Sequence, residues 1–170
     1  MKRSRAVAVL LLFLLSGCLK EDQVSQYSAN SLPPLFTKLS SEETGVDFIN
    51  EVEDQKRFNI FKYRNFYNGG GVAIGDINND GLPDIFFTAN MKKDRLFLNK
   101  GNFKFEDITD SAGVAGTKPW NTGVMMVDVN NDGFLDIYVS NAGNMEGNNH
   151  DNDLYINNGD LTFTERAAEY

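Results

Sequence analysis

One segment of this chain occurs twice, and this internal repeat restricts the possible folds more than any other feature of the sequence. Residues 71–87 align with residues 123–139 at an offset of 52, and residues 95–105 align with residues 153–163 at an offset of 58. The six additional residues of the second copy fall in the polar stretch 144–152. A polar surface loop is where an insertion is tolerated. Self-similarity of this kind is typical of repeat architectures, so the sequence predicts two copies of one structural unit.

Four short segments in each copy are predicted to be β-strands, because they are rich in β-branched and aromatic residues and are bounded by Asn, Asp and Gly. They are residues 71–75, 84–88, 95–98 and 103–106 in the first copy, and residues 123–127, 136–140, 153–156 and 161–164 in the second. The intervening sequences at 99–102 and 157–160 supply residues that adopt positive φ in a tight hairpin. Four antiparallel strands per repeat is the layout of a β-propeller blade, so the predicted fold is all-β, with two four-stranded blades of an incomplete propeller.

The loop between the first two strands of each copy has the pattern Asp-x-Asn-x-Asp-Gly-x-x-Asp. Positions 1, 3, 5 and 9 offer side-chain oxygens, position 7 offers a backbone carbonyl, and the glycine at position 6 permits a sharp reversal. Hard oxygen ligands, three of them anionic, suit Ca²⁺ better than Mg²⁺ or a transition metal. The predicted calcium ligands are Asp76, Asn78, Asp80, the Leu82 carbonyl and Asp84 in the first copy, and Asp128, Asn130, Asp132, the Phe134 carbonyl and Asp136 in the second.

These loops differ from an EF-hand, which needs a bidentate Glu at position 12 and flanking helices. Position 12 is here Phe87 or Val139, inside a predicted strand. The alternative is a turn rich in Asn and Asp that binds no ion, because these residues and Gly favour such turns. Three carboxylates within nine residues would repel one another without a cation, and their presence in both copies favours the calcium site.

The two loops and their flanking sequences also carry a family resemblance. The chain resembles FG-GAP/VCBS-like repeat proteins, and the stretches beginning Phe66-Tyr-Asn-Gly-Gly-Gly and Leu98-Asn-Lys-Gly-Asn-Phe resemble bacterial proteins related to cartilage acidic protein, of the ASPIC/UnbV type. The resemblance extends over residues 35–170 and implies calcium-loop propeller blades. Two departures are the lack of a Phe-Gly…Gly-Ala-Pro string and of an ASPIC/UnbV segment in this sequence.

The first eighteen residues resemble a bacterial lipoprotein signal. Lys2, Arg3 and Arg5 form a positively charged start, and the apolar run 6–15 is too short to span a hydrocarbon core. Leu-Ser-Gly-Cys at 15–18 resembles the lipobox, whose cysteine receives a diacylglycerol. We therefore predict a signal peptide over residues 1–17 and lipidation of Cys18; the alternative is an ordinary secretory signal with an incidental cysteine.

Residues 18–34 are polar, end in two prolines and are predicted to form a tether. The absence of Asp directly after Cys18 favours an outer-membrane location in the bacterial cell envelope. Lys-Glu-Asp at 20–22 resembles a surface-export signal of Bacteroidota lipoproteins, although a solvated tether explains it equally simply. Beyond the tether we predict lead-in strands over 35–68, a first repeat over 69–118 and a truncated second repeat over 119–170.

Charge and composition exclude several functions. The formal net charge is −8, and it becomes −11 if residues 1–17 are removed, because three cations and no acidic residue are lost. Such an acidic chain repels phosphate backbones, so no nucleic-acid partner is expected. A single cysteine excludes an internal disulfide and a multi-thiolate zinc site, and the single histidine, His150, makes a His-dependent catalytic site a poor fit.

The predicted function is therefore non-enzymatic: a lipid-anchored, calcium-binding module that binds a protein or glycan ligand outside the cytoplasm. The alternatives are an accessory or enzymatic component of a polysaccharide-processing system, and a scaffold for a C-terminal domain. A closed propeller takes at least about four blades. We therefore expect this chain to be part of a longer protein.

Several residues allow two interpretations, one structural and one functional. Phe66, Tyr67 and Trp120 are predicted to pack between blades rather than to form a ligand platform. The glycines at 69–71 are predicted to allow close backbone packing, because they precede a strand and lack the lysine of a phosphate-binding loop. Residues 106–113 are predicted to form a helical turn ended by Gly113. His150 and Asp151 are assigned to a solvated loop, with a binding or catalytic role as the alternative.

Overall fold

The computed structural model describes residues 34–116, 118–142 and 151–170. The chain divides into two units, Met1–Thr37 and Lys38–Tyr170, and every helix and strand described belongs to the second unit. The predicted signal peptide, Cys18, His150 and the tether up to residue 33 lie outside the described residues. No helix in the described part is long and apolar enough to cross a membrane.

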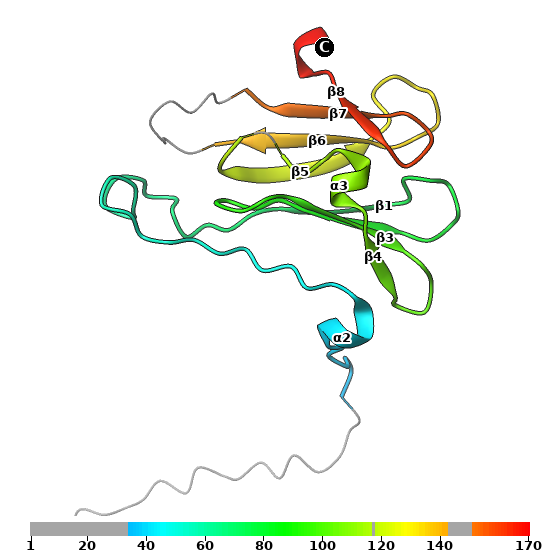
Figure 1. The fold of residues 1–170 in the computed structure, drawn as a ribbon, viewed down its shortest axis with the longest axis horizontal. Helices are drawn as coiled ribbons and strands as arrows, with labels where there is room; N and C mark the ends of the chain where they lie inside the picture. Colours follow the sequence, from blue (N-terminus) through cyan, green and yellow to red (C-terminus); the bar gives the residue numbers. More distant parts are fainter. Residues whose placement is uncertain (1–33, 117, 143–150) are drawn as a thin grey trace, which may run out of the picture. The chain divides into compact units, whose positions relative to one another are not determined.

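Two four-stranded antiparallel sheets form the body of the Lys38–Tyr170 unit (Figure 1). The first contains β1 (Val72–Gly75), β2 (Asp84–Phe87), β3 (Arg95–Asn99) and β4 (Phe105–Asp107), and the second contains β5 (Asn121–Val127), β6 (Asp136–Asn141), β7 (Asp153–Asn157) and β8 (Phe163–Glu165). Each strand pairs with the next one in sequence, in the order β1-β2-β3-β4 and β5-β6-β7-β8. This architecture confirms the predicted all-β fold with two propeller-type blades.

The register of the two sheets is also repeated. Val72 of β1 pairs with Phe87 of β2, and Val124 of β5 pairs with Val139 of β6, at the offset of 52 that the sequence shows. The helical turn after the first sheet is α3 (Thr109–Ala112), which ends at Gly113 with a left-handed φ of 77°. The prediction for this segment is therefore confirmed. A short 3-10 helix, η1 (Ala167–Glu169), follows β8.

The last strand of each sheet begins two residues later than predicted. The hairpins extend further because Asn102 and Phe103 have φ values of 50° and 57°, and Leu161 has a φ of 68°. A left-handed backbone cannot continue a β-ladder, so β4 and β8 start at Phe105 and Phe163. The apolar side chain of Phe103, which suggested a strand residue, is instead 70% exposed in the turn.

The lead-in strands predicted over 35–68 are not formed, and this prediction is wrong. Helix α2 (Ser41–Thr44) begins there because Ser40 and Glu43 form a capping box, with each side chain accepting a hydrogen bond from the backbone N–H of the other. Further along, local turn hydrogen bonds engage the backbone, as where the Lys62 and Tyr63 N–H groups donate to Asn59. The only β-pairing described in this segment is one isolated bridge between Gln55 and Phe58.

The main core lies between the two sheets. It contains buried side chains from both, including Phe86, Leu96, Ile137, Val139 and Tyr155. Strand alternation explains this arrangement, since Ala73 is buried while its neighbours Val72 and Ile74 are exposed.

Glycines allow the sheets to approach where β1 begins. A Cβ on Gly71 would lie 2.6 Å from the Thr122 carbonyl oxygen, and one on Gly70 would lie 2.1 Å from the Thr88 carbonyl oxygen. The Thr88 hydroxyl accepts a hydrogen bond from the Gly71 N–H and donates to the Thr122 carbonyl, both at 2.6 Å. These contacts confirm close backbone packing for Gly70 and Gly71. A Cβ on Gly69 would meet nothing within 4 Å, so Gly69 serves a left-handed φ of 81° instead.

A second core is aromatic and joins the segment before β1 to the start of β5. Its buried members are Phe58, Phe66 and Trp120, with Tyr63 packed edge-on against Trp120. The packing prediction is confirmed for Phe66 and Trp120. Tyr67 packs edge-on against Phe66 but is 60% exposed, and its hydroxyl donates to Asp54.

Candidate functional site

The two loops with the repeated acidic pattern connect equivalent strands. The first, residues 76–84, joins β1 to β2, and the second, residues 128–136, joins β5 to β6. Both reverse direction through left-handed residues at position 4, Asn79 and Asn131 (φ 60° and 61°), and at position 6, Gly81 and Gly133 (φ 84° and 91°). We call them loop 1 and loop 2. Asn and Gly are the residues that adopt this conformation most readily, which explains the loop sequence locally.

In loop 1 the carboxylates organise the backbone. Asp76 Oδ1 and Oδ2 accept hydrogen bonds from the N–H groups of Asp80 and Gly81 at 3.1 and 2.7 Å. Asp80 Oδ1 accepts from the Leu82 N–H at 2.8 Å, and Asp80 Oδ2 accepts from the Asn78 side-chain amide at 3.0 Å. The side chains at positions 1, 3 and 5 are therefore all directed into one reversal.

Loop 2 repeats these bonds position by position. Asp128 accepts from the N–H groups of Asp132 and Gly133 at 3.1 and 2.9 Å. Asp132 accepts from the Phe134 N–H at 2.9 Å and from the Asn130 side-chain amide at 2.8 Å. Two loops far apart in the sequence thus fold into the same hydrogen-bonded arrangement.

Asp84 and Asp136, at position 9, are fully buried. Asp84 Oδ2 and Oδ1 accept from the N–H groups of Ile77 and Asn99 at 2.9 and 2.7 Å. Asp136 accepts in the same way from Val129 and Asn157, at 2.9 and 2.8 Å. Burial raises the pKa of Asp84, the two N–H donors oppose this rise, and the nearby carboxylates of Asp80 and Asp76 add to it.

Sequence reasoning missed the roles of Asn99 and Asn157, which it assigned only to hairpin turns. Besides the backbone bonds to the position 9 aspartates, the side-chain amide of Asn99 donates to the Pro83 carbonyl at 2.8 Å, and that of Asn157 donates to the Leu135 carbonyl at 3.1 Å. Each asparagine therefore fastens its loop to the third strand of its own sheet. The aligned Asn-x-Gly sequences that begin at the last residues of β3 and β7 were a signal that could have revealed them.

The donor chemistry of both loops fits Ca²⁺. In the described part of the chain, no three or more His, Cys, Asp or Glu side chains are grouped so that they could hold a metal ion. The carboxylates instead bind backbone N–H groups, as in the ion-free turn that sequence analysis left open. An ionised carboxylate has about four acceptor positions, so these bonds leave lone pairs for a cation.

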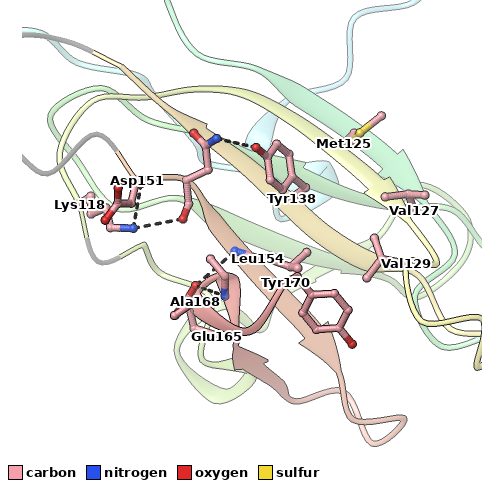
Figure 2. A pocket seen from close by; sticks show the side chains of 12 residues that line it. Lys118, Met125, Val127, Val129, Tyr138, Asp151, Leu154, Glu165, Ala168 and Tyr170 are labelled. Carbon is pink, nitrogen blue, oxygen red and sulfur yellow. Dashed lines mark hydrogen bonds between the residues drawn. The ribbon is translucent and has the colours of Figure 1, made fainter.

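A hollow of about 900 Å³ lies on the face of the second sheet that points away from the main core (Figure 2). Its apolar lining includes Met125, Tyr138 and Leu154, from β5, β6 and β7. The corresponding positions of the first sheet are Ala73, Phe86 and Leu96, which are buried in the core between the sheets. The hollow therefore lies on the face of the second sheet that is equivalent, by the repeat, to the packed face of the first sheet.

Polar residues border this hollow. Lys118 Nζ donates to the Asp151 carbonyl at 2.8 Å and forms an ion pair with Asp153 Oδ1 at 2.8 Å. Asp151 itself is exposed, as predicted for a loop residue.

Comparisons with known proteins find similarity over the part of the chain that contains both loops. Residues 76–139 match the FG-GAP-like repeat family, so the match runs from the first residue of loop 1 to beyond the end of loop 2. The chain is 41% identical over 78 residues to cartilage acidic protein 1 of Xenopus tropicalis, and 38% identical to the proteins of that name from Mus musculus (73 residues) and Homo sapiens (76 residues).

These alignments cover 45%, 43% and 44% of this chain, but only 12%, 11% and 12% of the three relatives, in the same order. The similarity therefore concerns a small part of each of those proteins. The match of residues 76–139 to the FG-GAP-like repeat family and the partial homology to cartilage acidic protein 1 confirm the resemblance predicted from the two loops.

Proposed function

We propose that this chain is a calcium-binding, non-enzymatic module that binds a protein or glycan ligand outside the cytoplasm. The observation that carries the proposal is the pair of loops, which share their oxygen donors, their left-handed positions and their hydrogen bonds. Their backbone hydrogen bonds add no positive charge to offset the repulsion among the three carboxylates of each loop, and the same set recurs in both copies. FG-GAP-like repeats suggest an extracellular ligand-binding or adhesion module, which supports the location and the kind of function.

Calcium, when bound, would supply the positive charge that balances the three carboxylates of each loop. Asp76, Asn78, Asp80, the Leu82 carbonyl and Asp84 would hold it in loop 1, and Asp128, Asn130, Asp132, the Phe134 carbonyl and Asp136 in loop 2. These residues form the reversals between β1 and β2 and between β5 and β6, so calcium binding is expected to make both loops more rigid. The net charge of −8 supports the proposal that nucleic acid is not a partner.

Calcium is expected to raise the melting temperature of the protein in a way that depends on both loops. Extracellular modules bind Ca²⁺ with a Kd of about 10⁻⁴–10⁻³ M, so calcium at about ten times that Kd should stabilise the folded state by about 1.4 kcal/mol per site. Asp80→Ala and Asp132→Ala should each remove the contribution of one site, which is about half of the total for the two loops. Thermal melts followed by circular dichroism, in chelator and in calcium, measure the effect.

Asp110→Ala is the matched control for this experiment, because Asp110 is an exposed carboxylate on α3, outside both loops. It should leave the calcium response unchanged, and Mg²⁺ at the same concentration should give a smaller response than Ca²⁺. Identical melting curves of the unaltered protein in chelator and in calcium would contradict the proposal.

We further propose that the module is anchored to the bacterial cell envelope, at the outer membrane, through a lipid on Cys18. Cys18→Ser should abolish lipidation and move the protein from the detergent phase to the aqueous phase in a partitioning experiment, because the acyl chains supply the membrane affinity. Ser16→Thr, which keeps Cys18, should partition as the unaltered protein does. Detergent partitioning of Cys18→Ser equal to that of the unaltered protein would rule out the anchor.

A further inference from the structure

Loop 1 and loop 2 are joined by a continuous chain of buried hydrogen bonds. Asp84 Oδ2 accepts from the Ile77 N–H at 2.9 Å, the Ile77 carbonyl accepts from the Asn157 side-chain amide at 2.9 Å, and the Asn157 N–H donates to Asp136 Oδ1 at 2.8 Å. The two buried position 9 aspartates are thus connected through only two intervening residues. All four residues of this hydrogen-bond series are buried.

The backbone of Ile77 is central to this connection. It lies between the proposed ligands Asp76 and Asn78, and its side chain is 1% exposed in the core between the sheets. Its N–H is bound within loop 1, and its carbonyl is bound by the second sheet. A change in the position of Asp84 therefore acts on the backbone of Ile77, a residue whose carbonyl is bound by the second sheet.

A second link crosses between the loops at the surface. The side-chain amide of Asn79, at position 4 of loop 1, donates to the carbonyl of Gly133, at position 6 of loop 2, at 3.0 Å. The carbonyl belongs to the residue whose N–H binds Asp128 in the same loop. Both ends of this bond therefore belong to the reversals that carry the proposed ligands.

We infer that the two calcium loops bind their ions cooperatively, through Asn157 and Asn79. This inference rests on the proposed calcium binding. Filling one loop fixes its reversal and, through the shared hydrogen bonds, also restricts the backbone of the other loop. The second ion then binds to a loop that is already ordered, so its affinity is higher than in a protein whose other loop is empty.

The coupling is measured by comparing the intact protein with variants in which one loop is disabled. Calorimetric titration of Asp132→Ala gives the affinity of loop 1 alone, and titration of Asp80→Ala gives that of loop 2 alone. The product of the two stepwise association constants of the unaltered protein should exceed the product of these separate constants by about fivefold or more, the lower end of typical allosteric coupling.

Asn79→Gly tests the surface link without disturbing the loop, because glycine accepts the left-handed φ of 60°. Asn131→Gly is its matched control, at the same position of loop 2 with a φ of 61°, and the Asn131 side chain forms no hydrogen bond within the described residues. The fivefold excess should fall in Asn79→Gly and in Asn157→Ala, and persist in Asn131→Gly. Amide hydrogen exchange at Leu82 and Phe134 reports separately whether each loop remains folded.

The possible outcomes separate the inference from the function on which it rests. If the unaltered protein binds no calcium, the proposed function fails. If it binds two ions and the products of the constants agree, calcium binding stands and the cooperativity is refuted. If the excess is present but equal in Asn79→Gly, Asn157→Ala and Asn131→Gly, the coupling does not pass through these asparagines and the inference is overturned.

Discussion

Replacing Trp120 with alanine is expected to lower the free energy of unfolding by about 3–5 kcal/mol, the usual loss when a buried Trp is truncated to Ala. Trp120 is 1% exposed, and its ring centroid lies 4.8 Å from that of Phe58 and 5.2 Å from that of Phe66. Its backbone N–H also donates to the Asn90 carbonyl, and its carbonyl accepts from the Ala142 N–H. Urea denaturation followed by circular dichroism measures the loss, since the variant lacks the chain's single Trp as a fluorophore.

Phe61→Ala provides the comparison for Trp120→Ala. Phe61 belongs to the same turn-rich segment as Phe58 but is 94% exposed. Truncating its side chain should therefore change the free energy of unfolding by no more than about 0.5 kcal/mol. The turn segment around Phe58 should also become more accessible to protease in Trp120→Ala. A loss below 1 kcal/mol in Trp120→Ala (roughly the size of an ordinary substitution) would show that the aromatic cluster does not hold this segment.

Asp94 is expected to make the protein less stable as the pH rises from about 4 to about 7. Burial raises the pKa of Asp94 from 3.8 to about 7, hydrogen bonds from the Ala89 N–H and the Asn121 amide oppose this rise, and the charge of Asp153 adds to it. In that pH window the folded protein keeps a proton that the unfolded chain has lost, so raising the pH favours unfolding. Stabilisation present below pH 4 is thus lost as the pH passes through about 7, and the loss is on the order of a few kcal/mol.

Asp94→Asn should abolish this pH dependence and give a protein more stable than the unaltered one above pH 7. The second repeat already has asparagine at the equivalent position, since Asn152 precedes β7 as Asp94 precedes β3. Asn152 Oδ1 accepts a hydrogen bond from the Asn141 N–H at 3.0 Å, as Asp94 Oδ1 does from the Ala89 N–H. The Asn121 Oδ1 atom, which has no hydrogen-bond partner among the described residues, can accept from the introduced amide after the Asn121 side chain turns over.

Urea denaturation at several pH values measures the difference between Asp94→Asn and the unaltered protein. Asp110→Asn removes one carboxylate from an exposed position and should keep the slope of the unaltered protein. If Asp94→Asn and the unaltered protein lose stability in parallel between pH 4 and pH 7, Asp94 is not the group responsible.

Local sequence patterns predicted most of the two sheets. Strand residues such as Ile85 and Ile137 pair where the repeats placed them, because short β-rich segments separated by Asn, Asp and Gly have few other arrangements. The ends of the hairpins were less predictable. Phe103 and Leu161 have side chains that favour strands, and the turn geometry nevertheless holds them in left-handed conformations.

The segment before β1 shows where pattern reading failed. Its apolar residues suggested strands, but Phe58 and Phe66 are buried against Trp120, which is more than fifty residues further along the chain. Because the partner of this segment is an aromatic cluster and not a strand edge, the backbone has no ladder to join and satisfies its hydrogen bonds in local turns.

The sequence by itself determined the repeated blade, the two reversals and the oxygen donors of each loop, because all of these depend on residues within one short stretch. Only the tertiary structure decided that Ile77 is bound by Asn157, 80 residues away, and that Asp94 is enclosed beside Asn121. Nothing in a local pattern distinguishes an asparagine that ends a hairpin from one that also reaches the neighbouring sheet. That distinction arises from the packing of one sheet on the other, which brings the two loops close together and keeps the hydrogen bond between Asn157 and Ile77 away from water.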